Sequence, residues 1–360
     1  MRWKAACLLL ISVCALPAAG MQPPSWTLKA KVKGVSVEGS PLAWSSRQVL
    51  LLSRDGYLLD FDPADAQDFS KTNLTFRSYT AVEMRERLRG ELGQNFEVIS
   101  TGHYLVAQPR GQGSQWADRF EELYRSFWTY FRVRGFALKE PAFPLVAIVW
   151  PNQADYLRYS AREKSQIGAN MLGYYWSVSN RVALYDVGAG QNAAAFRQVN
   201  LDTVIHEATH QVAFNTGIHN RFAPPPKWVS EGLATMFEAP GVWNSRNYPR
   251  QVDRINRDRL EDFKRYAATK RKVGAIADVV AYDRLFDSDP GAAYAEAWAL
   301  TFFLSETLPR DYARYLARTA QRQAFTDYSA PDRLADFTAV FGSNLRLLDA
   351  QFLRYIDGLK

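Results

Sequence analysis

Two histidines one helical turn apart, with a glutamate between them, are the residues of this chain best suited to chemistry. Residues 204–211 read VIHEATHQ and place His206 and His210 four positions apart. At this spacing two side chains share one face of an α-helix, roughly 6 Å apart, so both imidazoles can reach one Zn²⁺ at about 2.0–2.1 Å. Glu207 lies slightly round the helix, where it can hold a zinc-bound water and accept its proton. The pattern therefore indicates hydrolytic metal chemistry.

The surrounding sequence favours the helix that this spacing requires. Residues 196–213 contain neither Gly nor Pro, and apolar residues flank the motif on both sides. An HExxH string can also occur by chance in a helix whose histidines bind nothing. An acidic helix downstream argues against that alternative.

A third protein ligand is expected on this second helix. Residues 227–238, KWVSEGLATMFE, carry apolar residues at helical spacing, after three prolines at 224–226 that end the previous element. Glu231 would complete a set of two His and one Glu, and would leave the fourth zinc position open for water. The alternative is that Glu231 is simply a carboxylate near a helix N-terminus, where the helix dipole favours it.

Other candidate ligands fit less well. An HExxHxxGxxH site would need glycine at position 213 and histidine at position 216, where the chain has Ala213 and Thr216, so His219 falls three residues late. Glu238 is expected either to hydrogen-bond a ligand imidazole or to face solvent. His103, at a turn that enters a strand, is expected to be structural.

The segments HEATHQ and WVSEGLATMFE together resemble the gluzincin superfamily of zinc metallopeptidases, the peptidase-MA-like clan that includes thermolysin and the aminopeptidase N group. Within it, the chain is similar to a secreted bacterial family known only as a domain of unknown function. The resemblance covers roughly residues 140–310 and implies a zincin-like fold with Glu207 as general base. The ligands of one Zn²⁺ that it implies are His206, His210 and Glu231.

The resemblance also suggests a second catalytic residue. Residues 293–300, AYAEAWAL, are similar to the helix on which the aminopeptidase N group places a tyrosine that donates to the tetrahedral oxyanion, and Tyr294 is the match. The Lys-Gly pair that follows this tyrosine in the aminopeptidases is absent here, and Tyr294 could instead be a packed aromatic. Aminopeptidases have an acidic motif that anchors the substrate's N-terminus, and the chain has no such motif. Its absence favours endopeptidase action.

The start of the chain is typical of a bacterial secretory signal. Residues 1–4 are basic, and residues 5–16 form an apolar stretch too short to span a bilayer. Small residues then precede an expected cleavage after Gly20. Both cysteines, Cys7 and Cys14, fall inside this segment, so the secreted or periplasmic chain would contain no disulfide. A lipoprotein processed at Cys14 is the alternative. No later segment is apolar enough to predict a transmembrane helix.

Composition limits the partners. The chain has 360 residues, of which 47% are hydrophobic, and a formal net charge of +7, which suits one large or two ordinary domains. The positive charge is spread over many arginines rather than concentrated in one tract. We expect no nucleic acid partner, because the chain is expected to be exported and has no nucleic-acid-binding motif. The expected partner is a peptide or protein substrate in the cell envelope. The sequence does not indicate an oligomeric state.

We predict an α+β fold of two domains after the signal at residues 1–20. Residues 21–110 are expected to be a small β-rich domain, with strands near 28–32, 48–52 and 57–59 and a helix at 81–92. Residues 111–360 are expected to be the zincin-like domain. Its mixed sheet should precede the zinc helix, and the chain should be mostly helical from residue 253 onward.

An expected hairpin lies just before the zinc helix. Residues 173–178 and 181–185 alternate around the turn pair at 179–180. In zincin-type folds this position holds the strand that borders the cleft, so residues 181–185 could pair with an extended peptide. An ordinary internal hairpin is the alternative.

The sequence is compatible with two functions. The first is an exported zinc-dependent peptidase, and the second is an inactive zinc-binding module that binds envelope protein or polymer. Glu207 favours the first, because a protein that only binds has no need of a general base.

Overall fold

The computed structural model describes residues 26–163, 165, 168, 171–188 and 193–360, which belong to two compact units. The first unit ends at Ser78, and the second runs from Tyr79 to Lys360. The expected signal at residues 1–20, its cleavage point at Gly20, and Cys7 and Cys14 lie outside the described residues. The described chain is mixed α+β, with a β-rich N-terminal region and a helical C-terminal part.

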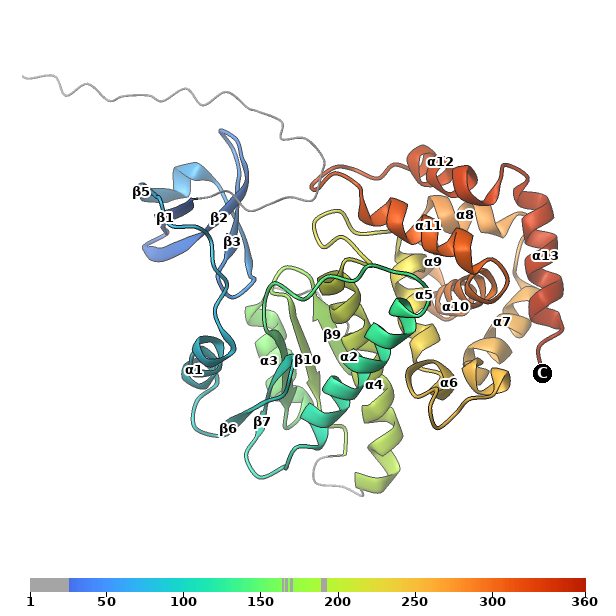
Figure 1. Ribbon diagram of the computed structural model, residues 1–360, viewed down its shortest axis with the longest axis horizontal. Helices are drawn as coiled ribbons and strands as arrows, with labels where there is room; N and C mark the ends of the chain where they lie inside the picture. Colours follow the sequence, from blue (N-terminus) through green and yellow to red (C-terminus); the bar gives the residue numbers. More distant parts are fainter. Residues whose placement is uncertain (1–25, 164, 166–167, 169–170, 189–192) are drawn as a thin grey trace, which may run out of the picture. The chain divides into compact units, whose positions relative to one another are not determined.

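The first unit is an antiparallel sheet with the strand order β4-β3-β2-β1-β5 (Figure 1). Its strands are β1 (Thr27–Val32), β2 (Val35–Trp44), β3 (Val49–Ser53), β4 (Leu58–Phe61) and β5 (Ala66–Thr72). Lys33 and Gly34, both at positive φ, form the tight turn between β1 and β2. Four side chains form the buried core: Leu28, Val49, Leu51 and Phe61. The three expected strands are confirmed, whereas β2 and β5 were not expected.

The second unit contains a mixed sheet with the strand order β6-β7-β8-β10-β9. Its strands are β6 (Phe96–Ser100), β7 (Tyr104–Pro109), β8 (Leu145–Trp150), β9 (Gly173–Trp176) and β10 (Arg181–Tyr185). The three central strands are parallel, and each edge strand is antiparallel to its neighbour. Helices cover both faces (Figure 1): α1 (Ala81–Leu92) and α3 (Gln153–Arg162) on one, α2 (Gln115–Arg132) and α4 (Ala193–Thr216) on the other. Burial on both faces explains the continuous apolar run LVAIVW of β8.

The division between the units lies earlier than the expected boundary at residue 110. Strand β7 pairs in parallel with β8, with Tyr104 opposite Leu145. Residues 96–109 therefore belong to the sheet of the second unit, and residue 110 falls between β7 and α2. The sequence predicted a strand after the turn at His103, which is β7, but could not reveal that its partner β8 lies about forty residues further along the chain. Strand β6 was not expected.

The hairpin at residues 173–185 is present, but its outer strand is not the one expected. Strand β10 lies between β8 and β9, so residues 181–185 cannot accept another strand. Strand β9 is the edge instead. The burial of the first four residues of β10 agrees with its internal position.

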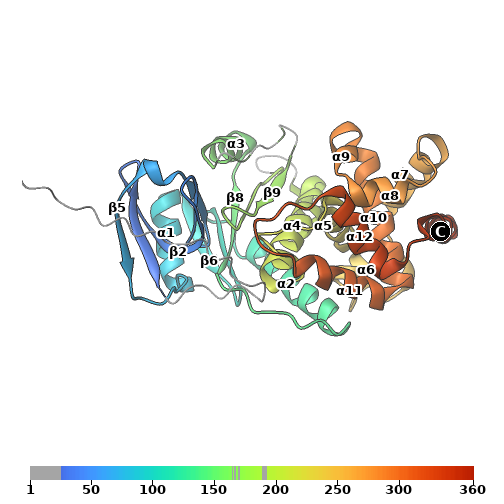
Figure 2. The ribbon, with the colours of Figure 1, turned by 90° about the horizontal axis from the view of Figure 1, so that it is seen from above.

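Beyond α4 the described chain contains helices and no strand. They are α5 (Lys227–Phe237), α6 (Pro240–Trp243), α7 (Arg257–Thr269), α8 (Ala275–Ala281), α9 (Arg284–Ser288), α10 (Pro290–Thr307), α11 (Pro309–Ala320), α12 (Ala330–Phe341) and α13 (Leu345–Asp357), with a 3₁₀ turn at Gln251–Arg254. Helix α10 is buried almost throughout and packs against α5, α7, α9, α11 and α13 (Figure 2). The expected helical C-terminal part is thus confirmed.

Helices α5 and α10 approach each other very closely at Gly232. A Cβ atom at this position would overlap the carbonyl oxygen of Ala297 and the Thr301 hydroxyl. Only glycine permits this approach of one helix to the other.

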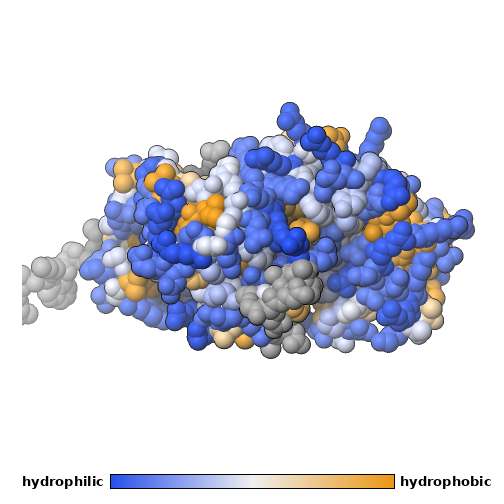
Figure 3. All heavy atoms as spheres, turned by 90° about the horizontal axis from the view of Figure 1, so that it is seen from below, coloured by the Kyte–Doolittle hydropathy of each residue, from blue (hydrophilic) through white to orange (hydrophobic). Residues whose placement is uncertain are grey.

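The surface in Figure 3 is mostly hydrophilic, with small separate apolar areas. Within the described ranges, we find no helix with both the length and the hydropathy needed to cross a membrane.

Candidate metal centre

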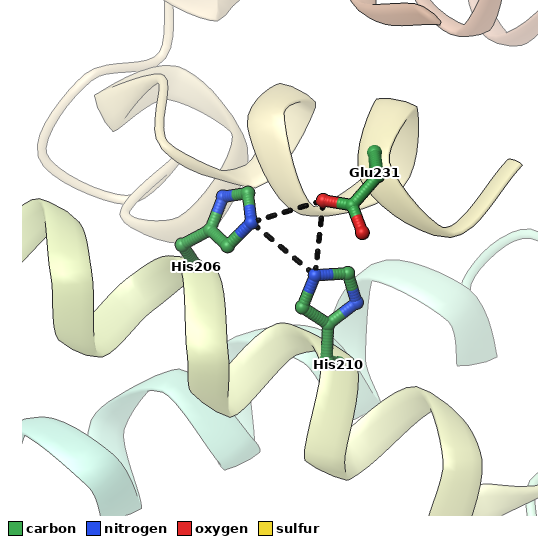
Figure 4. Close-up of side chains that lie close together, drawn as sticks. All are labelled: His206, His210 and Glu231. Carbon is green, nitrogen blue, oxygen red and sulfur yellow. Dashed lines mark hydrogen bonds and ion pairs between the residues drawn. The ribbon is translucent and has the colours of Figure 1, made fainter. Parts of the chain in front are cut away.

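Three side chains from two helices meet at one point (Figure 4). His206 and His210 lie one turn apart on α4, and Glu231 reaches them from α5. The two Nε2 atoms are 3.2 Å apart. Glu231 Oε2 lies 3.3 Å from Nε2 of His206 and 3.4 Å from Nε2 of His210. In the described part of the chain, this is the one group of three or more His, Cys, Asp or Glu residues whose ligand atoms lie within 4.8 Å of one another.

The spacing of these three atoms fits a tetrahedral metal ion. Tetrahedral ligands about 2.0–2.1 Å from Zn²⁺ are separated from one another by about 3.3–3.4 Å. The three separations of 3.2, 3.3 and 3.4 Å agree with that value. Two imidazoles and a carboxylate are also ligand types that zinc binds. The residues therefore fit one zinc ion with a fourth position left over.

The carboxylates around the site favour a cation. Burial alone would raise the pKa of Glu231, but His210 and His206 lower that pKa well below its usual value, so the carboxylate is ionised. Glu207 and Glu238 bring two further acidic groups to the same histidines. Such a concentration of negative charge beside two imidazoles suits a divalent ion.

His206 is oriented by Glu238, which follows the last residue of α5. Its Oε1 atom lies 2.8 Å from Nδ1 of His206. A carboxylate on Nδ1 fixes the proton there and leaves Nε2 as the metal-binding nitrogen. Of the two roles considered for Glu238, the structure shows the contact with an imidazole, that of His206.

His206, His210 and Glu231 form the candidate metal-ligand cluster. Glu207 lies beside this cluster, and a backbone N–H of the edge strand β9 holds its carboxylate. Its Oε2 atom accepts a 2.7 Å hydrogen bond from the backbone N–H of Tyr175 in β9. Burial raises the pKa of Glu207, against the lowering effect of His206 and His210. A carboxylate with a raised pKa next to a metal site is suited to accept and return a proton.

Tyr294 lies on α10, close to the same cluster. Its ring centroid is 6.3 Å from that of His206, and the ring also contacts Phe286 and the Arg259 guanidinium. Burial, followed by the charges of Glu231 and Glu207, raises the pKa of Tyr294 well above its usual value. The phenol therefore keeps its proton and can donate a hydrogen bond. It is a packed aromatic and also a neighbour of the metal-ligand cluster.

Buried amides fix the hairpin to α4. Gln211, one residue after His210, donates to the carbonyl oxygens of Val146 and Asn180 at 3.0 and 2.8 Å. Asn215 and Asn180 exchange hydrogen bonds between their side-chain amides. These hydrogen bonds join the helix that carries the histidines to β8 and to the turn of the hairpin.

The remaining histidines lie outside the cluster. His219 is buried and its Nδ1 hydrogen-bonds the carbonyl oxygen of Ile218. His103 hydrogen-bonds Glu121 through Nδ1 and stacks on Tyr124, which agrees with the structural role expected for it.

Two contacts at the site were not anticipated from the sequence. Every residue except proline has a backbone N–H, so nothing in the sequence marked Tyr175 as the partner of Glu207. Asn256 contacts Glu238 from the start of α7, and its only signal was its place before a helical pattern, where Asn is a common N-cap.

Comparisons with known proteins give limited matches. A family model described as "Protein of unknown function (DUF1570)" matches residues 200–326, which include the metal-ligand cluster and Tyr294. No curated protein shows significant similarity to the chain.

Among solved structures, the chain is similar to an M1 zinc metallopeptidase from Deinococcus radiodurans. A point mutant of that enzyme has 14% identity and a TM-score of 0.38, and the match covers 73% of this chain and 51% of that one. The same mutant bound to a Tyr-Ser-Ala substrate gives 12% identity and a TM-score of 0.39, with 72% and 50% covered. The chain thus spans about half the length of these structures.

Proposed function

We propose that the protein is an exported zinc-dependent peptidase with a zincin-like catalytic domain. The tetrahedral spacing of His206 Nε2, His210 Nε2 and Glu231 Oε2 carries the proposal. These three residues would hold the ion. A bound zinc would supply Lewis acidity and lower the pKa of a water molecule to near neutrality.

Two residues of the chain would handle protons and charge. Glu207 would accept the proton of the attacking water and pass it to the leaving amine. The hydrogen bond from Tyr175 N–H holds its carboxylate beside the histidines. Tyr294, which stays protonated, would donate a hydrogen bond to the oxyanion that forms during peptide-bond cleavage.

An extended peptide would bind along β9. Across the β9–β10 pair, Tyr185 N–H donates to Leu172 and Asn180 N–H donates to Trp176. The alternate residues Gly173 and Tyr175 therefore direct their backbone groups away from β10, and Tyr175 N–H already faces Glu207. A substrate strand added at this edge would place its backbone beside the metal site. Internal positions of a chain can bind in this way, which favours endopeptidase action.

We place the protein outside the cytoplasm, in the periplasm or secreted, because residues 1–20 have the pattern of a signal peptide. Its substrate would be a peptide or protein of the cell envelope. Residues 26–72 carry no feature that assigns them a separate activity.

The test is a comparison of two glutamates with the same substitution. The processed protein, purified from a secreting bacterium, should contain about one zinc per chain by elemental analysis and digest an unfolded protein until a chelator is added. Glu207→Gln should keep the zinc and lose activity by at least about 10²-fold. Glu231→Gln should lose the zinc itself.

Two results would contradict the proposal. A wild-type protein without a transition metal would exclude the metal centre. A protein that retains zinc but cleaves no member of a broad peptide library would favour the inactive binding module.

A further inference from the structure

Asn256, the residue before α7, uses its whole side chain in hydrogen bonds. Its Oδ1 accepts from the backbone N–H of Arg259 at 3.2 Å, which caps the N-terminus of α7. Its Nδ2 donates to Glu238 Oε2 at 2.8 Å and to the carbonyl oxygen of Thr235 at 3.1 Å. Capping requires only the first of these bonds. The other two connect Asn256 to the end of the helix that carries Glu231.

The contact with Glu238 leads directly to the metal-ligand cluster. One carboxylate oxygen of Glu238 accepts from Asn256, and the other lies 2.8 Å from Nδ1 of His206. Glu238 is therefore held at both oxygens and cannot rotate without breaking one bond. An imidazole whose Nδ1–H is bound to a fixed carboxylate keeps both its tautomer and its ring plane.

We propose that Asn256 is a positioning residue that fixes Glu238 and thereby orients His206 for zinc. This inference rests on the proposed metal centre and assigns a new residue to it. The direction of the amide is essential to the role, because only the NH₂ group can face the carboxylate of Glu238 favourably.

The same residue also anchors the helix beside Tyr294. Arg259, whose N–H is capped by Asn256, has its guanidinium carbon 5.5 Å from the centroid of the Tyr294 ring. Helix α7 packs against α10, which carries that tyrosine. Asn256 is therefore connected to His206 through Glu238, and to Tyr294 through Arg259.

An aspartate at position 256 separates capping from positioning. Asn and Asp are equally good N-caps, so Asn256→Asp keeps the bond to Arg259 N–H. It replaces the donor that faces Glu238 with an acceptor that carries like charge. We expect about tenfold weaker zinc binding, the lower end of the loss seen for residues that support a ligand. Asn256→Ser keeps a capping hydroxyl, adds no charge and should weaken zinc binding severalfold.

Asn344 provides the matched control. It caps α13 by accepting from Leu347 N–H at 3.1 Å, and no described hydrogen bond connects it to the metal-ligand cluster. Asn344→Asp and Asn344→Ser should leave zinc affinity within about twofold of wild type, because they change a cap alone.

The measurements are the Zn²⁺ dissociation constant by competition with a chromogenic chelator and the visible absorption spectrum of the Co²⁺-substituted protein. For Asn256→Asp we expect weaker binding and an altered Co²⁺ spectrum, with urea unfolding of the metal-free protein close to that of Asn344→Asp. Unchanged zinc affinity in both Asn256 variants would overturn the inference while leaving the metal centre intact. An equal loss in the Asn344 variants would overturn it too, because capping alone would then explain the effect. A wild-type protein that binds no zinc would overturn both the inference and the proposed function.

Discussion

The carboxylate of Glu207 accepts a 2.7 Å hydrogen bond from the backbone N–H of Tyr175. This bond joins the expected general base on α4 to the edge strand β9 along which a substrate would lie. In the proposed enzyme, the same strand would therefore position both the base and the substrate. The hairpin is itself attached to α4 through Gln211 and Asn215, so this relationship does not depend on a single contact.

Removal of the Tyr175 N–H should impair catalysis without loss of metal. The fold should tolerate Tyr175→Pro, because β9 is an edge strand and this N–H points away from β10. A hydrogen bond to a charged group contributes roughly 1.5–3 kcal/mol, so we expect kcat/KM to fall by at least about tenfold. Tyr175→Phe keeps the N–H and serves as the control, with activity near wild type. Equal activity of the two variants, at equal zinc content, would show that the bond has no role.

Tyr294→Phe should lower turnover by about 10²–10³-fold, the usual cost of losing one donor to an oxyanion. Zinc content should stay the same, because the tyrosine is not one of the three candidate ligands. Steady-state kinetics and elemental analysis on the same preparation measure both quantities. Tyr312→Phe, a buried tyrosine on α11, is the control for loss of a hydroxyl in the core. A kcat for Tyr294→Phe as high as that of the control would contradict the assignment.

A buried ion cluster holds α10 in place. Arg271 lies 2.8 Å from Glu296 on α10 and 2.6 Å from Asp349 on α13, and all three side chains are almost fully buried. Arg271→Met would leave buried carboxylates without their partner, so we expect a loss of about 3–5 kcal/mol in the free energy of unfolding.

Urea denaturation measures this loss. Arg314→Met is the control, because Arg314 forms an exposed ion pair with Asp311 and should contribute under about 1 kcal/mol. Similar midpoints for the two variants would mean that the buried cluster adds little to stability.

His219 should make the protein sensitive to acid. Burial lowers the pKa of His219 to about 3, whereas an unfolded histidine titrates near pH 6.5. Between these values only the unfolded chain binds the proton. The contribution of neutral His219 to the free energy of unfolding is therefore fully present above about pH 6.5. It is lost as the pH falls, by about 2 kcal/mol at pH 5.

The variant His219→Asn should remove this part of the pH dependence. The observable is the change in unfolding free energy between pH 7 and pH 5, compared with that of wild type and of His103→Asn. The control retains His219, so a change of slope found only in His219→Asn would assign this part of the pH dependence to His219. An identical slope in all three proteins would rule out His219 as its origin.

The sequence was most informative where function depends on local spacing. His206, Glu207 and His210 are placed by one helix, so a period of 3.6 residues is enough to bring them to one side. Glu231 could be predicted for a similar reason, because its helix could be recognised in the sequence and a zinc site requires a third protein ligand. In the second unit, β7 and both strands of the hairpin were predicted, since alternation and turn signals are also local.

Relationships between distant segments could not be predicted. Alternation does not say which strand of a hairpin lies outermost, so β10 was expected where β9 lies. Similarly, β7 resembled part of the N-terminal domain until its pairing with β8 was known. Between Glu238 and Asn256 the chain forms α6, a loop and a 3₁₀ turn, and no periodic pattern predicts a contact across these segments.

The glycine that follows Glu231 has a consequence for how the site tolerates change. A single methyl group added at Gly232 would collide with α10. It would push apart α5, which carries Glu231, and α10, which carries Tyr294. The spacing between α5, which carries Glu231, and α10, which carries Tyr294, is thus set at this point by a residue with no side chain. We expect added bulk at Gly232 to alter the distance between Glu231 and Tyr294 more than most replacements of exposed residues would.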